Sequence, residues 1–273
     1  MPSQADKGAA FRALHVRDGT FVIPNPWDVG SALILEGMGF EALATTSSGF
    51  ANSLGRFDGQ VTRDEKMEHC RSLADAVSVP VSADLENCFA DSPEGVGETV
   101  SRAVQSGLAG CSVEDYTDKP KPEIYDFDLA VERVKAAVHV ARAQSFPFTI
   151  TARAEGVLRR VQDLDEVVRR LKAFEAVGAD VLYAPGLTTI DEVRKVVSSV
   201  TRPVNVLAMP NFTVGNLAAT GAKRISLGGW LARVATGSLM RAAGAMKDQG
   251  IFENLKDAAS GGDIATVLKR GET

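Results

Sequence analysis

The sequence predicts an α/β protein built as a (β/α)8 barrel of the TIM type. Short β-branched runs alternate with longer amphipathic runs along the whole 273-residue chain, which is typical of repeated βα units and a parallel sheet. Glycine stands at several helix-to-strand joints, as at Gly107 and Gly178, where it can end a helix in the left-handed conformation. Eight strands, each followed by a helix, are the number that closes a barrel.

The elements follow one another without an interdomain linker. The expected strands cover residues 21–23, 42–45, 81–84, 111–114, 148–152, 181–183, 204–207 and 224–227. The expected helices between and after them cover residues 29–38, 63–77, 93–106, 129–144, 164–177, 190–200, 214–220 and 231–247. An extra helix over residues 5–15 should cover the N-terminal mouth of the barrel. We therefore expect one barrel domain over residues 1–250 and a helical tail over residues 251–273, which needs a neighbour such as a second subunit.

Composition and charge narrow the class of partner. The net charge is -5 and the pI is about 5.4, and no run of five or six like charges occurs, so a nucleic-acid partner is disfavoured. The three cysteines are odd in number and lack metal-binding spacing, which favours reduced thiols in a cytosol. The sequence shows neither a signal peptide nor a membrane span. We expect a cytoplasmic protein with no membrane partner.

Acidic residues follow three consecutive strands of the predicted barrel. Asp84 and Glu86 end the third strand, Glu114 ends the fourth, and Glu155 follows the fifth. The C-terminal ends of barrel strands lie on one face, where the catalytic residues of such barrels are found. Carboxylates without a histidine or cysteine partner suit Mg²⁺ or Mn²⁺ rather than Zn²⁺. The alternative is that these acids cap helices or lie in solvated loops.

Three strand ends carry candidate substrate-binding groups. Arg153 ends the fifth strand, where its guanidinium fork would suit a substrate carboxylate or phosphonate; the alternative is pairing with Glu155 or Glu114. The turn after the second strand offers hydroxyls and backbone N–H groups for an anion. The predicted substrate-binding residues are Arg153, Ser47, Ser48, Gly49 and, after the first strand, Trp27.

Five ordered motifs resemble one enzyme superfamily. They are Asn25-Pro-Trp-Asp, Thr45-Thr-Ser-Ser-Gly-Phe-Ala-Asn-Ser-Leu-Gly-Arg-Phe-Asp58-Gly, Asp84-Leu-Glu86, Val113-Glu-Asp115 and Ala152-Arg-Ala-Glu155. The chain from about Phe21 to Leu231 resembles the isocitrate lyase and phosphoenolpyruvate mutase superfamily. The resemblance implies cleavage or formation of a C–C or P–C bond next to a pyruvate unit, through an Mg²⁺-stabilised enolate.

The resemblance also implies roles for individual residues. Asp84 would be the direct Mg²⁺ ligand, while Asp58, Glu86 and Glu114 would hold the metal through its waters. Arg153 would bind the substrate carboxylate, and backbone groups of Ser47, Ser48 and Gly49 would bind its other oxygens. Members of the superfamily are usually homotetramers that exchange C-terminal helices, so we expect a homotetramer or dimer.

The chain departs from the superfamily pattern in the loop after the fourth strand. Isocitrate and methylisocitrate lyases carry Lys-x-Cys-Gly-His there, whereas this loop has neither cysteine nor histidine, which argues against both activities. Cys88 and Cys111 do not replace that cysteine by position and are interpreted as structural. Mutases and phosphonopyruvate hydrolases place asparagine or threonine in this loop, and Thr117 is the only candidate. In the usual Asp-x-Asp-x-Gly-Tyr-Gly motif, Glu86 replaces the second Asp and Asn87-Cys-Phe replaces the following residues.

These observations favour an Mg²⁺-dependent lyase or decarboxylase that cleaves a C–C bond of a small 2-oxo or 2-hydroxy di-acid. The candidate proton donors are Tyr116, Lys119, Lys121 and Tyr125, and the predicted catalytic residues are Arg153, Glu114, Tyr116 and Lys119. One alternative is P–C bond chemistry, as in a phosphonomutase or phosphonopyruvate hydrolase. Another is a catalytically inactive barrel that serves as a binding protein.

Overall fold

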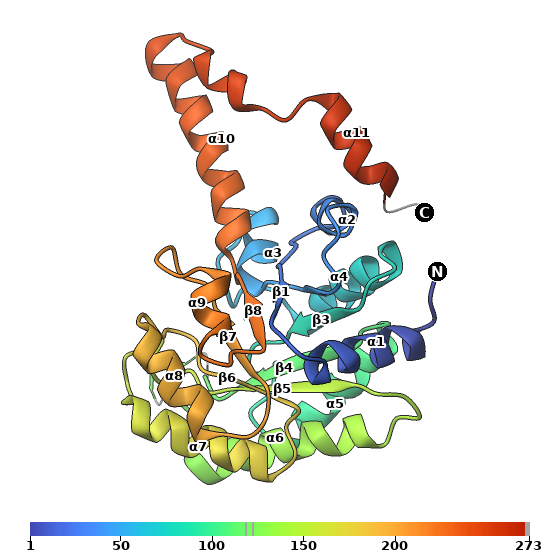
Figure 1. Ribbon diagram of the computed structural model, residues 1–273, viewed down its shortest axis with the longest axis vertical. Helices are drawn as coiled ribbons and strands as arrows, with labels where there is room; N and C mark the ends of the chain where they lie inside the picture. The colour runs from blue at the N-terminus through green and yellow to red at the C-terminus, as the bar shows by residue number, and fades with distance from the viewer. Residues whose placement is uncertain (118, 122, 271–273) are drawn as a thin grey trace.

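Eight parallel strands form a nearly closed barrel in the computed structural model (Figure 1), which describes residues 1–117, 119–121 and 123–270. The strands are β1 (Phe21–Ile23), β2 (Leu43–Ala44), β3 (Val81–Asp84), β4 (Gly110–Glu114), β5 (Thr149–Arg153), β6 (Val181–Tyr183), β7 (Val204–Leu207) and β8 (Arg224–Ser226). From β2 to β8 each strand pairs with the next one in chain order, and β8 pairs with β1. A backbone hydrogen bond of 3.0 Å from Ala44 N to the oxygen of Pro24 links β2 to the end of β1. The predicted barrel is confirmed.

Helices surround the strands. They are α1 (Gln4–Val16), α2 (Val29–Gly37), α3 (Ser47–Ser53), α4 (Arg63–Ala76), α5 (Pro93–Gln105), α6 (Phe127–Arg142), α7 (Leu164–Ala176), α8 (Ile190–Ser199), α9 (Val214–Ala218), α10 (Trp230–Gln249) and α11 (Gly261–Arg270), with a 3₁₀ helix, η1, at Glu253–Asp257. The strand boundaries lie within one residue of those predicted, and the helix boundaries within two. Gly107 and Gly178 have φ of +81° and +99°, the conformation expected where a helix ends before a strand.

The N-terminal helix α1 packs against the starting ends of the strands. Phe11 and Leu14 of α1 form a buried cluster with Phe21 and Ile23 of β1. The ammonium group of Lys7 is buried and donates to the backbone oxygens of Ala74 and Val77 at the end of α4. As predicted, α1 lies at the N-terminal mouth of the barrel.

The C-terminal segment extends away from the barrel. The helix α10 projects from β8, and the chain then returns through η1 so that α11 lies near α2 (Figure 1). A Cβ at Gly37 would collide with the backbone oxygen of Val267, so the glycine permits this close approach. Large apolar side chains of α10 stay exposed, including Val234, Leu239 and Met240. In the described part of the chain, no helix has both the length and the apolarity to cross a membrane.

Candidate active site

Two small cavities open at the C-terminal ends of the strands. The first, called here the mouth cavity, has a volume of about 190 Å³ and is lined from all eight strand ends. The second, called the carboxylate cavity, has a volume of about 170 Å³ and is lined by Ser47, Asp58, Gly59, Glu86, Asn87, Glu114, Tyr116, Arg153 and Arg159. Ser47, Asp58, Arg153 and Arg159 line both. The two cavities therefore form one candidate site on the face that carries catalysis in such barrels.

Asp84 lies at the end of β3 with both carboxylate oxygens in contact. Its Oδ1 is 2.8 Å from Arg153 Nη1, and its Oδ2 accepts the backbone N–H of Ser47 at 3.3 Å. Burial opposes ionisation of this carboxylate, but the charges of Arg153 and Lys66 and the backbone donors together lower its pKa. Asp84 is therefore ionised in the centre of the site.

Arg153 is held by three carboxylates at once. Its Nη1 pairs with Asp84, while its Nη2 lies 2.7 Å from Glu155 and 3.1 Å from Glu114. Its Nε donates to Glu155 as well, at 3.0 Å. Of the two predictions for this residue, the pairing with Glu155 and Glu114 is observed, and the guanidinium also faces both cavities, as substrate binding would require.

Negative charge is concentrated around this arginine. Burial and the proximity of Asp84 raise the pKa of Asp58. Burial also raises the pKa of Glu114 well above its usual range, and the charges of Glu155 and Asp84 add to this effect although Arg153 opposes it. Carboxylates this close are destabilised unless a cation or a proton accompanies them. The site is therefore electrostatically suited to a bound cation.

The donor atoms fit a hard cation. Asp58, Asp84, Glu86 and Glu114 line the two cavities, and neither lining includes a cysteine or histidine. Oxygen ligands of this kind suit Mg²⁺ or Mn²⁺. Among the described residues, no group of three or more such side chains converges closely enough to hold an ion by direct contact alone.

The turn after β2 presents an N-terminal helix end to the mouth cavity. The hydroxyl of Thr46 caps α3 by accepting the N–H of Gly49. Ser47 and Ser48, two of the predicted substrate-binding residues, line the mouth cavity. Gly49 and Trp27 do not line it; an added Cβ at Gly49 would lie 3.1 Å from Trp27 Cβ. Trp27 and Gly49 therefore pack behind the turn that carries the two serines.

The loop after β4 brings one of the four predicted proton donors to the site. Tyr116 lines the carboxylate cavity. Lys119 forms an ion pair with Asp91, and the hydroxyl of Tyr125 donates to the same carboxylate at 2.6 Å. Lys121 is exposed. None of these three lines either cavity; Lys119 and Tyr125 contact Asp91 instead.

The altered loop after β3 has an unusual backbone. Glu86, Cys88 and Phe89 have φ of +53°, +60° and +54°, a conformation that glycine adopts at little cost and other residues adopt rarely. The buried Arg133 fastens this loop by donating to the backbone oxygens of Asn87 and of residues 90 and 91. The left-handed conformation thus occurs at Cys88, where the superfamily motif has a glycine and this chain does not.

The three cysteines are buried and unpaired by disulfides, as expected for structural thiols. Burial raises the pKa of Cys70 to about 11 and that of Cys88 to about 12, and the pKa of Cys111 lies well above its usual range for the same reason. These thiols are therefore protonated and unreactive at neutral pH.

Sequence reasoning missed two cationic residues of the site. Lys66 of α4 is buried, and its Nζ lies 3.1 Å from the hydroxyl of Thr45. Its position four residues before Cys70, on the apolar face of an amphipathic helix, is the signal that could have revealed it. Arg159 lies in the loop after β5 and lines both cavities. No pattern distinguishes it from the adjacent Arg160.

A supporting layer behind the site was also not predicted. The carboxylate of Asp115 accepts the backbone N–H of Glu155 at 2.8 Å and pairs with Arg170 at 3.1 Å. Burial raises the pKa of Asp115 to about 6 in spite of these contacts. Asp115 and Arg170 therefore fix the backbone from which Glu155 holds Arg153.

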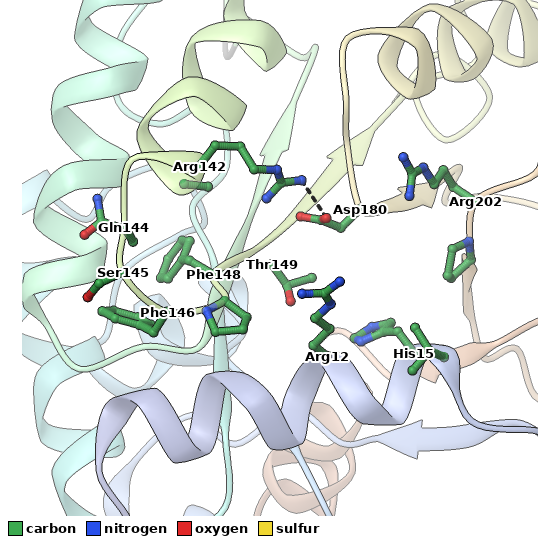
Figure 2. A pocket seen from close by; sticks show the side chains of 14 residues that line it. Arg12, His15, Arg142, Gln144, Ser145, Phe146, Phe148, Thr149, Asp180 and Arg202 are labelled. Carbon is green, nitrogen blue, oxygen red and sulfur yellow. Dashed lines mark hydrogen bonds and ion pairs between the residues drawn. The ribbon is translucent and has the colours of Figure 1, made fainter.

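A larger cavity of about 580 Å³ lies at the opposite end of the barrel, between α1 and the loop before β5. Figure 2 shows Arg12 and His15 of α1 on one side and Arg142, which pairs with Asp180 at 2.6 Å, on the other. Thr149, the first residue of β5, marks this as the N-terminal face. Barrels of this type carry their catalytic residues at the C-terminal ends of the strands, whereas the N-terminal face contributes to stability. We therefore do not assign this cavity to the active site.

The geometry defines a class of protein: a (β/α)8 barrel enzyme that gathers acidic residues and an arginine at the C-terminal ends of β3, β4 and β5. The family model for phosphoenolpyruvate phosphomutase matches residues 11–247. The chain belongs to this family, within the isocitrate lyase and phosphoenolpyruvate mutase superfamily of Mg²⁺-dependent C–C lyases and phosphonomutases. The sequence-based resemblance is confirmed.

The similar proteins include named lyases and a protein whose activity is assigned only provisionally. A crystal structure from Burkholderia cenocepacia J2315, assigned provisionally as a lyase/mutase, is 49% identical, covers 96% of this chain and 95% of that chain, and has a TM-score of 0.93. The structure of 2,3-dimethylmalate lyase is 25% identical, covers 98% of this chain and 95% of that chain, and has a TM-score of 0.83. The 2-methylisocitrate lyase of Escherichia coli K12 is 29% identical over 77% of this chain and 74% of its own.

Proposed function

We propose that this protein is a divalent-metal-dependent lyase that cleaves a C–C bond of a small 2-oxo or 2-hydroxy di-acid, by decarboxylation or retro-aldol cleavage. The observation that carries the proposal is the cluster of Asp58, Asp84, Glu86 and Glu114 around Arg153 in a cavity without cysteine or histidine. Such a site can bind a cation and an anion together, but it lacks the thiol on which isocitrate cleavage depends in the relatives that the sequence resembles.

The metal would be held by Asp84 directly and by Asp58, Glu86 and Glu114 through water. A direct contact from one carboxylate agrees with the absence of a three-residue ligand group among the residues described. When bound there, Mg²⁺ or Mn²⁺ supplies positive charge that stabilises negative charge developing on a substrate oxygen. The raised pKa of Asp58 and of Glu114 supports this assignment, because a cation would relieve the repulsion that contributes to both shifts.

The remaining residues bind and orient the substrate. Arg153 would exchange its contacts with Asp84 and Glu114 for the carboxylate at the pyruvate end of the substrate. The N–H of Ser47, at the first position of α3, donates to Asp84 Oδ2 and would pass to a substrate oxygen once a cation occupies that carboxylate. Ser48 contributes its side of the mouth cavity. These groups would keep the bond to be cleaved beside the carboxylate cluster.

Tyr116 is the proposed proton donor to the enolate that cleavage leaves. It is the member of the predicted donor set that lines the carboxylate cavity. Proton transfer from its hydroxyl would leave a phenolate next to Arg159, whose Cζ lies 3.5 Å from the centroid of the tyrosine ring. The guanidinium charge would stabilise that phenolate until water restores the proton.

P–C bond chemistry is the second candidate. The second guanidinium at the site, Arg159, favours it, since a phosphonate carries more negative charge than a carboxylate. Thr117, the residue that the sequence offers for a phosphoryl group, is 3% exposed, and its hydroxyl accepts the N–H of Lys119 at 3.1 Å. Because Thr117 lines neither cavity, we rank C–C cleavage first.

A time course followed by ¹H and ³¹P NMR tests the proposal. The protein is incubated with Mg²⁺ and with oxaloacetate, substituted malates, isocitrate, methylisocitrate, phosphonopyruvate or phosphoenolpyruvate, with EDTA and the Asp84→Ala variant as controls. Metal-dependent release of pyruvate, glyoxylate or another 2-oxo acid supports the lyase. A change confined to the phosphorus spectrum supports P–C chemistry, and the absence of any reaction across the panel would contradict both.

We further propose that α10 mediates assembly into a homotetramer or dimer through exchange of the C-terminal helices. The exposed apolar residues of α10 support this, together with the groove of about 470 Å³ that α10 forms with α3. Exposed apolar surface of this kind commonly marks a protein interface. Sedimentation equilibrium of the full chain and of a chain ending at residue 229 tests the assignment: a monomeric full chain would contradict it.

A further inference from the structure

We propose that Arg159 forms a second anion-binding subsite, so that the substrate carries a further acidic group, a carboxylate or a phosphonate, beyond its pyruvate end. This inference rests on the proposed function, because it places the pyruvate end at Arg153. What it adds is the residue that would bind the second acidic group of that substrate, which the carboxylate cluster and Arg153 do not supply.

Arg159 is placed to contact a ligand in either part of the site. It follows β5 by six residues and lines both the mouth cavity and the carboxylate cavity. Its side chain is 33% exposed, whereas that of Arg153 is 13% exposed. The side chain of Arg159 is therefore more accessible to solvent than that of Arg153.

The two arginines differ in how far their charge is already neutralised. All three guanidinium nitrogens of Arg153 contact carboxylate oxygens. Arg159 has one such contact, in which its Nε lies 3.5 Å from Glu155 Oε2 without forming a hydrogen bond. Within the described ranges, its two terminal nitrogens have no hydrogen-bond partner. Donors of this kind are suited to a bidentate anion.

The position of Arg159 is fixed from two sides. Its guanidinium stacks on the ring of Tyr116, with Cζ 3.5 Å from the ring centroid. Glu155, which is fully buried, directs Oε1 to Arg153 and Oε2 toward Arg159. One rigid carboxylate thus sets the separation of the two guanidinium groups. A ligand with an anionic group at each end would match that arrangement, and a ligand with one short anionic end would not use it.

Two buried polar atoms between these residues are left without hydrogen bonds. Arg159 Nε and Glu155 Oε2 have no hydrogen-bond partner in the described part of the chain. A buried donor in this state is costly, because the lost hydration is not replaced. A small rotation of Arg159 toward an arriving anion would let Nε and a terminal nitrogen donate together. This observation independently supports ligand binding at Arg159.

The experiment compares a short probe with longer probes. Oxalate has the adjacent carboxylate and oxygen of a pyruvate enolate but no distal group, whereas difluorooxaloacetate and phosphonopyruvate add a distal carboxylate or phosphonate. Binding of each to the full-length protein is measured by isothermal titration calorimetry with saturating Mg²⁺. The variants are Arg159→Gln, Arg159→Lys and, as the matched control in the same loop, Arg160→Gln, which removes an equal charge from an exposed side chain that lines neither cavity.

The subsite predicts a selective loss. In Arg159→Gln, Kd for at least one longer probe should rise by roughly ten- to hundredfold, since a charge-assisted bidentate contact is removed, while Kd for oxalate changes less than about twofold. Arg159→Lys should recover part of the loss, and Arg160→Gln should behave as the parent protein. The longer probe with the larger loss identifies the distal group as carboxylate or phosphonate.

The failures are distinguishable. If Arg159→Gln bound oxalate and both longer probes with the affinities of the parent protein, the subsite would be overturned. The proposed function would then still stand. An equal loss for oxalate and the longer probes would also overturn it, because Arg159 would then act on the site as a whole. If the parent protein bound none of the probes in the presence of Mg²⁺, the proposed function would fail, and the subsite with it.

Discussion

Arg153 and Asp84 face each other across the ends of β5 and β3, with Nη1 2.8 Å from Oδ1 and both side chains largely buried. One residue is the proposed anion-binding group and the other the proposed metal ligand. Each side chain therefore serves as the counter-ion of the other. A bound cation would replace Arg153 beside Asp84, and a bound anion would replace Asp84 beside Arg153. A cation at Asp84 would free Arg153 for an anion, and an anion at Arg153 would free Asp84 for a cation.

This pairing predicts cooperative binding of Mg²⁺ and oxalate. Because coupling between two ligands is reciprocal, saturating Mg²⁺ should tighten oxalate binding by the same factor by which saturating oxalate tightens Mg²⁺ binding. We expect a factor of roughly ten or more, within the usual range of couplings. Calorimetric titrations in both orders measure it. Independent binding of the two ligands would mean that the ion pair persists in the complex.

Replacement of Asp84 should abolish turnover and leave the fold intact. Asp84→Ala removes the proposed direct ligand, while Arg153 keeps Glu114 and Glu155 as counter-ions. We expect a loss in kcat of roughly a thousandfold or more, since several kcal/mol of charge stabilisation would disappear. Turnover is measured on the substrate found by NMR, with circular dichroism to establish folding. A folded variant that still turns over with Mg²⁺ would refute the ligand assignment.

Arg153→Lys should impair both binding and turnover although it keeps the charge. Lysine cannot form the planar fork that now contacts three carboxylates, and it cannot bind a carboxylate through two parallel hydrogen bonds. We expect kcat/KM to fall by roughly ten- to a hundredfold, with KM raised and kcat lowered. Steady-state kinetics at saturating Mg²⁺ measure both. An unchanged kcat/KM would remove Arg153 from the substrate site.

Tyr116→Phe tests the role of the Tyr116 hydroxyl apart from that of its ring. The variant keeps the aromatic surface on which Arg159 stacks and removes only the proposed proton donor. We expect kcat to fall by roughly a hundredfold or more, as for loss of a general acid, with KM changed little. Incorporation of deuterium into the product gives a second readout. If kcat stays within twofold, the proton comes from water or from another group.

The barrel and the acidic cluster were predictable because the signals for both are local. Periodicity and helix-ending glycines such as Gly107 set the elements, and the (β/α)8 arrangement then brings every strand end to one face. Asp84, Glu114 and Arg153 meet there for that reason, from β3, β4 and β5.

The parts of the site that were missed depend on loop conformation. Lys119 looked suitable in the sequence, but Asp91, from the loop after β3, pairs with it. Arg159 and Arg160 are chemically identical neighbours, and only the path of the loop after β5 places the first in the site and the second outside. Such choices follow from contacts between distant segments, which a single sequence does not display.

Two buried histidines make a contribution to stability that is lost in acid. His15 Nε2 lies 3.3 Å from Arg224 Nη1, which can only donate, so Nδ1 carries the proton that is donated to the backbone oxygen of Phe11. His69 stacks on Phe50 at 3.7 Å between ring centroids. Burial lowers the pKa of each imidazole to about 3, and the nearby charges of Arg224 and Lys66 contribute.

The sign of the pH dependence follows from these directions. Below about pH 6.5 the unfolded chain protonates both imidazoles, whereas the native state keeps them neutral down to about pH 3. For these two groups the unfolded state then binds more protons, so their contribution to the free energy of unfolding falls as the pH drops through this window. At pH 5 each histidine should cost roughly 2 kcal/mol relative to pH 7.5. Above pH 6.5 their contribution should be constant.

Urea unfolding between pH 5 and 7.5, followed by circular dichroism, measures the effect. Replacing His15 by Gln removes one titrating group, so the variant should lose less stability between pH 7.5 and pH 5 than the parent, whatever its stability at pH 7.5. The exposed His139 on α6 provides the matched control, and His139→Gln should leave the pH dependence unchanged. Equal slopes in His15→Gln and the parent would show that the imidazole of His15 is protonated in the native state, and its hydrogen bond with Arg224 would then be impossible.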